Sequence, residues 1–297
     1  MEYKHIRPFF AIKSRDLPYS HPPQNRSMIF QKRTLGAMNP PKSHQRLQRM
    51  WRKAVIYCFC ILLGSFLILN EDWQTWNGLQ GLVQAAIITA YVLILLRIGI
   101  PLNYHPRKKV LHSNLGYGTW ITITRAMLIA ILAGYLFQPW PQSRLFPGRL
   151  SWTPGTLYLT ASLLDYLDGR VARAGNHETR LGAFLDINID ALGMLIAPLL
   201  AVWYGQLPSA YLSVGAAYYL LVFGIWLRKK FSKPVFKVKP RRSARIIAGF
   251  QMGFVGIALL PVISPPITTV AAYIFMIPLL AGFAKDWMIA GGYTNLG

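Results

Sequence analysis

Eight stretches of this 297-residue chain are long and apolar enough to form membrane-spanning helices. They cover about residues 54–70, 79–102, 120–140, 152–172, 183–205, 210–228, 246–263 and 267–287. About 20 consecutive apolar residues in a helix cross the hydrocarbon core of a bilayer. The sequence therefore predicts an all-α fold, in the form of a polytopic membrane helix bundle.

The composition agrees with a membrane location. Hydrophobic residues make up 53% of the chain and charged residues only 14%, whereas a soluble domain carries about 25% charged residues. The net charge of +22 could indicate a nucleic-acid partner. However, the Lys and Arg residues gather in blocks between the apolar runs, and no basic patch is interleaved with stacking aromatic residues. This pattern favours cytoplasmic loops beside an anionic membrane surface, so no nucleic acid is expected as a partner.

The positive charges also predict the topology. Residues 1–53 contain twelve Lys or Arg and are expected to form a basic, disordered cytoplasmic arm. A transit peptide is one alternative, and a later start at Met28, Met38 or Met50 is another. Basic loops follow the second, fourth and sixth apolar segments and alternate with charge-poor connections. Because basic loops stay in the cytoplasm, both termini are expected on that side.

Four aspartates lie within 26 positions of a chain that has only ten acidic residues, and these four are Asp165, Asp168, Asp186 and Asp190. An ionised carboxylate inside a membrane costs about 2.5–3.5 kcal/mol, so such a residue is a functional-site hypothesis by default. Spacings of three and four residues place each pair on one face of a helix. The 17 residues between the pairs are enough to end one helix, turn and start the next.

Two facing helices would then present the four carboxylates to one small space. That ligand set suits one or two Mg²⁺, Mn²⁺ or Ca²⁺ ions, and the lack of His and Cys argues against zinc or copper. A pair of metal ions held in this way is the usual clamp for in-line displacement at phosphorus. The aspartates are therefore expected at the cytoplasmic ends of their helices, as a metal site.

The residues around the aspartates fit a phosphate-containing substrate. Gly169, Ala172 and Gly182 are small and would let a ligand approach the helix backbones. Arg173 can make a bidentate contact to a phosphate. Taken singly, the small residues are explained by ordinary helix packing, and Arg173 by a cytoplasmic anchor. Their joint arrangement with four aspartates favours a functional site.

The segment DYLDGRVAR, eight further residues and then GAFLDINID match D-x2-D-G-x2-A-R-x8-G-x3-D-x3-D at every fixed position. This motif resembles the signature of the CDP-alcohol phosphotransferase (CDP-alcohol phosphatidyltransferase) family, including its phosphatidylglycerophosphate synthase-like members. The resemblance covers about residues 112–290 and implies a six-helix catalytic core. It divides the chain into the arm (1–53), two extra N-terminal transmembrane helices with a basic loop (54–111), the core (112–290) and a C-terminal tail (291–297).

The resemblance implies a reaction at the aspartates. Members transfer a phosphatidyl (substituted phosphate) group from CDP-diacylglycerol to an alcohol in phospholipid biosynthesis and release CMP. It implies that Asp165, Asp168 and Asp186 are metal ligands, and that Asp190 helps to hold the second ion and is the catalytic general base. Mg²⁺ or Mn²⁺ is the expected cofactor, with two ions bound.

The resemblance also implies that Gly169, Ala172, Arg173 and Gly182 form the nucleotide and pyrophosphate site. Frequent homodimers in the family make a homodimer the expected assembly, with membrane lipids as further partners. The active site is expected on the cytoplasmic face of a multi-pass integral membrane protein.

The acceptor alcohol is expected to carry a phosphate. Thr122-x2-Arg125 resembles a T-x2-R pattern seen at this place in many members. Arg245 and Gln251 stand where the glycerol-phosphate and inositol-phosphate members have Gly-Lys followed by Gln, although Ala-Arg here replaces Gly-Lys. Arg125, Arg242 and Arg245 could together bind an acceptor phosphate, and glycerol 3-phosphate is the first choice. The alternatives are inositol phosphate, serine or a second lipid, with the basic loop serving topology alone.

A function of a different class is a cation-coupled transporter lined by carboxylates. That function predicts acidic residues scattered at mid-membrane depth on several helices, together with internal repeats. The acidic residues of this chain cluster instead, and neither half echoes the other. The sequence therefore favours the enzyme.

Overall fold

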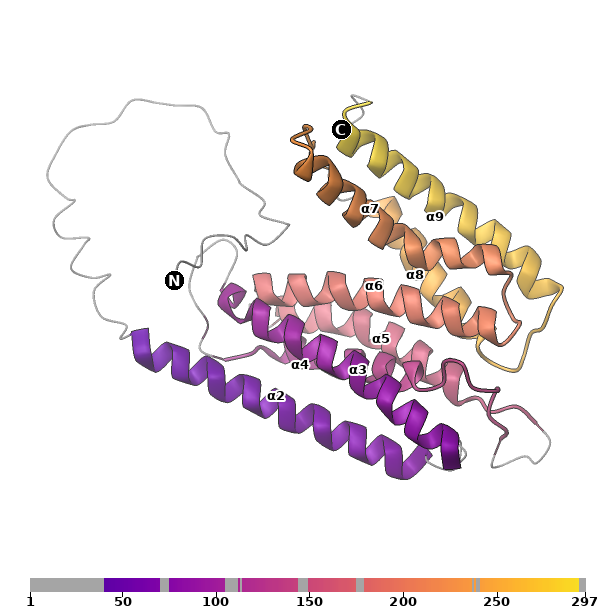
Figure 1. Ribbon diagram of the computed structural model, residues 1–297, viewed down its shortest axis with the longest axis horizontal. Coiled ribbons are helices and arrows are strands. Elements are labelled where there is room, and N and C mark those ends of the chain that lie inside the picture. The colour runs from indigo at the N-terminus through magenta and orange to yellow at the C-terminus, as the bar shows by residue number, and fades with distance from the viewer. Residues whose placement is uncertain are drawn as a thin grey trace, which may run out of the picture. The chain divides into compact units, whose positions relative to one another are not determined.

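The computed structural model describes residues 40–69, 75–104, 112, 114–143, 149–174, 179–236, 238 and 241–293. These residues form eight α-helices and two short 3₁₀ turns, without a β-strand (Figure 1). The elements are α2 (Pro40–Leu69), α3 (Thr75–Gly99), η1 (Ile100–Leu102), α4 (Tyr117–Ala133), α5 (Thr153–Ala174), α6 (Arg180–Trp203), η2 (Ser209–Tyr211), α7 (Leu212–Lys230), α8 (Arg242–Ala258) and α9 (Ile267–Gly291). The chain divides into two units, Met1–Ser43 and His44–Gly297, and the packing below is that of the second.

Each of the eight predicted segments falls on one of these helices. Five stretches are long and apolar enough to cross a membrane, namely Gln48–Leu69, Leu79–Leu102, Arg180–Trp203, Ser209–Lys230 and Ile267–Gly291. The prediction of a polytopic helical membrane protein is thus confirmed. Helices α4 and α8 are shorter apolar helices, and α5 carries the charged motif. For these three, a full crossing stays a prediction.

The start of α2 differs from the expectation of a disordered arm over residues 1–53. The helix begins at Pro40, so residues 40–53 are helical, while residues 1–39 lie outside the described part of the chain. Proline is favoured in the first turn of a helix, where its missing N–H costs nothing. The Gln, Arg and Lys residues that follow have high helix propensity, so the polar turns extend the apolar helix.

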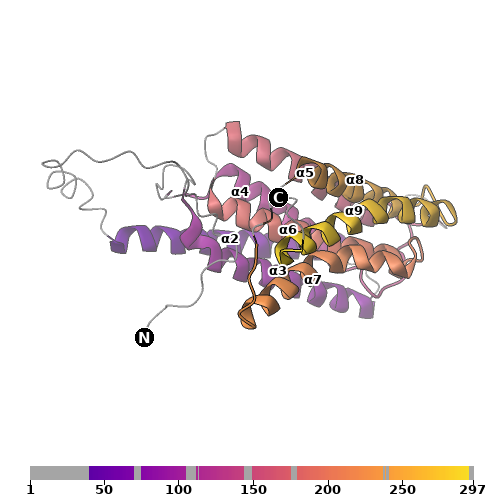
Figure 2. The ribbon, with the colours of Figure 1, turned by 90° about the horizontal axis from the view of Figure 1, so that it is seen from above.

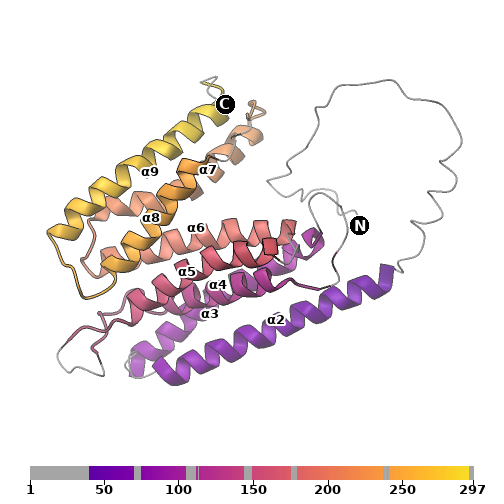
Figure 3. The same ribbon diagram turned by 180° about the vertical axis from the view of Figure 1, so that it is seen from behind.

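Helix α4 is the most buried helix of the bundle. It packs against α3, α5 and α6, and its side chains from Thr122 to Ala133 are nearly all buried. Helices α7 and α8 lie on α6 and α5, and α9 packs on both of them (Figures 2 and 3). Glycines permit two of these close approaches. A Cβ on Gly193 of α6 would lie 3.1 Å from Ile129, and one on Gly215 of α7 would lie 2.9 Å from the carbonyl oxygen of Met194.

The two N-terminal helices contact each other and the core through polar groups and one close approach. The hydroxyls of Tyr57 on α2 and Thr124 on α4 share a hydrogen bond of 2.8 Å, and Trp51 Nε1 donates to the carbonyl oxygen of Leu93 on α3 at 3.3 Å. A Cβ on Gly99 would lie 2.6 Å from Leu181 at the start of α6. The end of α3 therefore rests directly against the helix that carries the second pair of aspartates.

The segment between α7 and α8 is fastened to α9 at both of its ends. Arg228 Nη2 donates to the carbonyl oxygens of Pro234 (3.1 Å) and Gly291 (3.0 Å). Arg241 Nη2 donates to the carbonyl oxygen of Gly282 at 3.0 Å and pairs with Asp286 at 2.5 Å. These bonds fix the position at which α8 begins.

A buried polar bridge ties η2, α8 and α9 together. Gln251 is fully buried. Its Oε1 accepts a hydrogen bond from the Tyr211 hydroxyl, and its Nε2 donates to the carbonyl oxygen of Phe275 at 2.7 Å. Phe275 lies three residues before Pro278, which has no N–H and so interrupts the backbone hydrogen bonding of α9. Gln251 was associated with the acceptor site by resemblance, and its contacts here are between helices.

Replacing Gln251 by Leu is expected to lower the free energy of unfolding by about 1–2 kcal/mol, because the Tyr211 hydroxyl is left buried without an acceptor. Unfolding in detergent, followed by circular dichroism, measures the effect. The double variant Tyr211→Phe with Gln251→Leu is the control and should recover most of the loss. A single variant as stable as the parent would show that the bridge contributes nothing.

Candidate metal centre

Local sequence signals place the second pair of aspartates. Thr179 caps α6, because its Oγ1 accepts a hydrogen bond of 3.0 Å from the Gly182 backbone N–H. Leu181, Leu185 and Ile189 recur every four residues and are buried in the core. The cap and this apolar stripe fix the rotation of α6, so that Asp186 and Asp190 both face α5.

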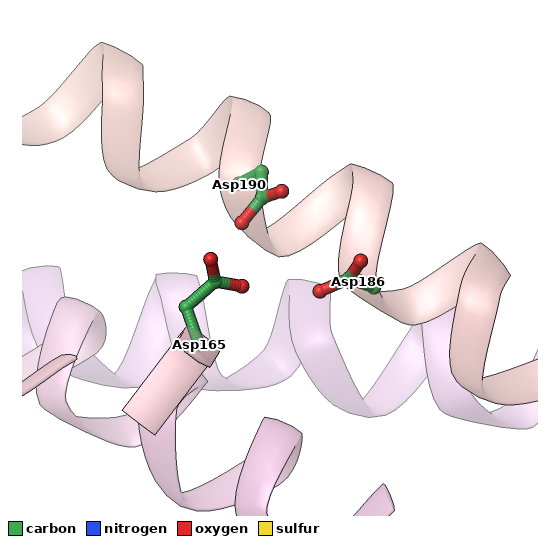
Figure 4. A group of neighbouring side chains, drawn as sticks. All are labelled: Asp165, Asp186 and Asp190. Carbon is green, nitrogen blue, oxygen red and sulfur yellow. The ribbon is translucent and has the colours of Figure 1, made fainter. Parts of the chain in front are cut away.

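Three carboxylates meet between α5 and α6. One oxygen from each of Asp165, Asp186 and Asp190 lies within 4.8 Å of the other two. Asp165 points from α5 toward the two side chains of α6 (Figure 4). The three side chains are 33%, 43% and 37% exposed, in that order, so they line an accessible site. The backbone of Asp168 is part of α5, but its side chain lies outside the described residues.

This set of donors fits a hard divalent cation. Carboxylate oxygens are the ligands that Mg²⁺, Mn²⁺ and Ca²⁺ prefer, and a trio of them leaves positions for water and substrate oxygens. Among the described residues of the group there is no His or Cys, which a zinc or copper site would use. The fit rests on the donor atoms and on their mutual distances.

Arg125 of α4 lies among the same carboxylates. Its side chain is only 2% exposed. Nη1 pairs with Asp165 and lies 3.3 Å from Asp186 Oδ1, while Nη2 lies 2.5 Å from Asp190 Oδ1. Nη2 also donates to the backbone carbonyl of Asp186 at 3.4 Å. The guanidinium thereby compensates the mutual repulsion of the carboxylates.

A small cavity of about 10 Å³ borders the group. Its walls include Tyr158 and Ser162 of α5, Gly193 of α6 and Met252 of α8. Sequence reasoning did not select these residues, although Tyr158 lies two helical turns before Asp165 and so on the same face. No comparable signal in the sequence marks Met252, since α8 reaches the site only through the packing of the bundle.

The remaining predicted residues have different outcomes. Gly169, Ala172 and Arg173 belong to the last turns of α5, and the side chains there lie outside the described residues. Among the described residues, a Cβ on Gly182 would meet only Thr179 Oγ1, at 3.4 Å, so their packing does not demand glycine at this position. This is consistent with space being kept for a ligand.

The three arginines assigned to the acceptor also differ in their positions. Arg125 contacts the aspartates, Arg245 is exposed in the first turn of α8, and the side chain of Arg242 lies outside the described residues. The predicted convergence of all three on one phosphate therefore stays a prediction.

The fold and the site together define an integral helical membrane protein with an acidic site for divalent cations between two of its helices. A model of the CDP-alcohol phosphatidyltransferase family matches residues 115–292, from the residues just before α4 to the end of α9. The chain therefore belongs to the CDP-alcohol phosphatidyltransferase family. Members of this family depend on divalent metal, in agreement with the carboxylate group.

The chain is also similar to bacterial proteins named CDP-diacylglycerol–glycerol-3-phosphate 3-phosphatidyltransferase. It is 31% identical over 100 residues to the protein of Salmonella choleraesuis, and 31% identical over the same length to that of Yersinia enterocolitica. It is 30% identical over 100 residues to the Escherichia coli K12 protein. Each match covers 31% of this chain and 50% of the relative. The chain thus spans about half the length of the curated relatives that it matches.

Proposed function

We propose that this protein transfers a phosphatidyl group from CDP-diacylglycerol to glycerol 3-phosphate and releases CMP. The observation that carries the proposal is the meeting of Asp165, Asp186 and Asp190 within 4.8 Å, between two helices of a membrane protein. The choice of acceptor is supported by the names of the bacterial relatives.

Asp165, Asp168 and Asp186 would hold the metal, with Asp190 shared between a second ion and the acceptor. Mg²⁺ or Mn²⁺, two ions in all, would neutralise charge on the pyrophosphate and on departing CMP when bound. Asp190 removes the proton from the acceptor hydroxyl. The acceptor oxygen then forms a bond to the β-phosphorus of CDP-diacylglycerol. The bond from that phosphorus to the bridging oxygen breaks, and CMP leaves with that oxygen.

Gly169, Ala172, Arg173 and Gly182 would line the nucleotide and pyrophosphate part of the site. The first three follow Asp168 along α5, and Gly182 is in the first turn of α6, so all belong to the helix ends nearest the carboxylates. The core of the enzyme would be residues 112–290, with α2 and α3 as an addition that packs on α4 and α6.

The active site and both termini would face the cytoplasm. Arg228, Lys229 and Lys230 end α7, as expected for a cytoplasmic helix end. Aromatic side chains that suit a membrane interface lie in the segment after α4 and at the end of α6. The rings of Phe137 and Trp203 pack at 5.3 Å, and Trp140 stacks on Tyr204 at 4.6 Å. A homodimer surrounded by membrane lipids is the proposed assembly.

An acceptor panel tests the proposed reaction. Purified full-length protein is incubated with labelled CDP-diacylglycerol, Mg²⁺ or Mn²⁺, and one acceptor at a time: glycerol 3-phosphate, inositol phosphate, serine or a second lipid. Release of CMP together with formation of phosphatidylglycerol phosphate supports the proposal. Release of CMP with only another acceptor keeps the reaction but overturns the acceptor. No release with any acceptor contradicts the proposed enzyme.

Arg245→Ala is expected to raise the KM for glycerol 3-phosphate about tenfold or more with a smaller change in kcat, because a charge-assisted contact to the acceptor phosphate is lost. Initial rates of CMP release at varied acceptor concentration measure the effect. Lys233→Ala, a change in the same basic segment, is the matched control and should leave the KM unchanged. An unchanged KM in Arg245→Ala would assign this residue to topology alone.

A further inference from the structure

We propose that Arg125 is a tethered cation that competes with the divalent ion for the carboxylates of Asp165, Asp186 and Asp190. This proposal rests on the proposed metal site. It gives Arg125 a role in metal binding, in addition to the predicted contact with the acceptor phosphate. It starts from the contacts of one buried guanidinium with all three carboxylates.

The two cations would compete for the same three carboxylates. Arg125 pairs with Oδ1 of Asp165, Oδ1 of Asp186 and Oδ1 of Asp190. Divalent ions bind carboxylate oxygens at about 2.0–2.6 Å, inside the space that the guanidinium nitrogens now take. The neighbouring cavity of about 10 Å³ has room for about one water. An ion that takes the Oδ1 atoms therefore has to move the guanidinium away from at least some of them.

The chemistry of arginine makes this competition persistent. The guanidinium stays charged at any pH that a protein experiences, so it cannot leave the carboxylates by losing a proton. Because its side chain is almost fully buried on α4, moving it without a new anionic partner is costly. Divalent ions thus bind more weakly than the three carboxylates alone would allow.

A phosphate-containing substrate would relieve that cost. The pyrophosphate of a CDP-linked lipid brings anionic oxygens to the same site, and a guanidinium displaced from carboxylates can pair with them in bidentate form. Metal and nucleotide would then strengthen the binding of each other through Arg125. Such coupling is reciprocal, so it can be measured as a change in metal affinity alone.

The test is a titration of the full-length protein in detergent with Mn²⁺, in which electron paramagnetic resonance counts the free ion. Arg125→Gln is expected to tighten the Mn²⁺ dissociation constant about tenfold, which corresponds to about 1.4 kcal/mol. Arg125→Lys should tighten it about threefold, because the ammonium keeps the charge but lacks the planar fork with which the guanidinium spans several carboxylates. A CDP-linked lipid should tighten Mn²⁺ binding more in the parent than in Arg125→Gln.

Arg180→Gln is the matched control for charge. Arg180 lies on α6 six residues before Asp186, about 9 Å along the helix, and its guanidinium stacks on Tyr104 at 5.2 Å. Its removal should change the Mn²⁺ dissociation constant less than threefold. If Arg180→Gln tightened Mn²⁺ binding as much as Arg125→Gln does, the effect would be general charge repulsion. The proposed competition at the carboxylates would then be wrong.

Stability provides a second measurement. In EDTA, Arg125→Gln should melt at a lower temperature than the parent, because three carboxylates lose their counter-ion, and Mn²⁺ should raise its melting temperature more than that of the parent. If Arg125→Gln does not fold, the Mn²⁺ affinity of Arg125→Lys is the test. An affinity that is unchanged or weaker than that of the parent overturns the proposal. If the parent binds no Mn²⁺, the proposed metal site itself fails, and that outcome is distinct from a failure of Arg125 alone.

Discussion

Asp190→Asn is expected to lower the rate of CMP release from CDP-diacylglycerol by about a thousandfold or more at saturating Mg²⁺. The amide cannot accept the proton of the acceptor hydroxyl, and general base catalysis is worth about 10²- to 10⁴-fold. Loss of one carboxylate oxygen from the metal group adds to the effect. Labelled CMP, separated from CDP-diacylglycerol after reaction, gives the rate.

The variant must remain folded for this result to be informative. Asn has the shape of Asp, and Asp190 is 37% exposed, so the melting temperature in detergent should stay close to that of the parent. Mn²⁺ binding should weaken without being lost, because Asp165 and Asp186 remain. Near-normal turnover in a folded variant would exclude Asp190 as the base.

Asp165→Asn is expected to weaken Mn²⁺ binding about a hundredfold and to abolish CMP release at millimolar Mg²⁺. Asp165 is the member of the carboxylate trio that comes from α5, so its loss leaves the other two carboxylates of the trio, both on α6. Changes outside the first ligand shell of metal sites already cost about 10- to 100-fold in affinity, and a direct ligand should cost at least as much. Free Mn²⁺ in a titration and CMP release at varied metal concentration provide the two measurements.

Ser162→Ala is the matched control for Asp165→Asn. Ser162 lies three residues earlier on α5 and lines the same small cavity, but its hydroxyl donates to the carbonyl oxygen of Tyr158 at 2.9 Å. This change should leave Mn²⁺ affinity within about threefold of the parent. If Asp165→Asn bound Mn²⁺ as tightly as the control, the carboxylates would be a structural charge cluster and the metal site would have to be sought elsewhere.

The helices and the carboxylate group could be predicted because both depend on local spacing. Apolar runs of about 20 residues define spans, and Asp186 and Asp190 share a face because they are one turn apart. The start of α2 was missed because hydropathy marks where a helix enters the membrane and carries no information on polar turns outside it. There, helix propensity decides the boundary.

The position of Arg125 could not be derived in this way. Its partners lie 40 to 65 residues away along the chain, and they meet only because α4 packs between α5 and α6. The same holds for Gln251 and Tyr211, which are 40 residues apart. The resemblance associated Arg125 and Gln251 with the acceptor, but no pattern along the chain states which distant groups a buried side chain will meet.

The bonds that fasten the segment between α7 and α8 have a consequence for substrate selection. Arg241 pairs with Asp286, and Arg228 holds the carbonyl oxygen of Gly291, so α9 sets where α8 starts and hence where Arg245 projects. None of the proposed site residues belongs to α9. The last helix would nevertheless act as a template for the acceptor side of the reaction, and substitutions along it could shift the preferred alcohol while the aspartate chemistry stays intact.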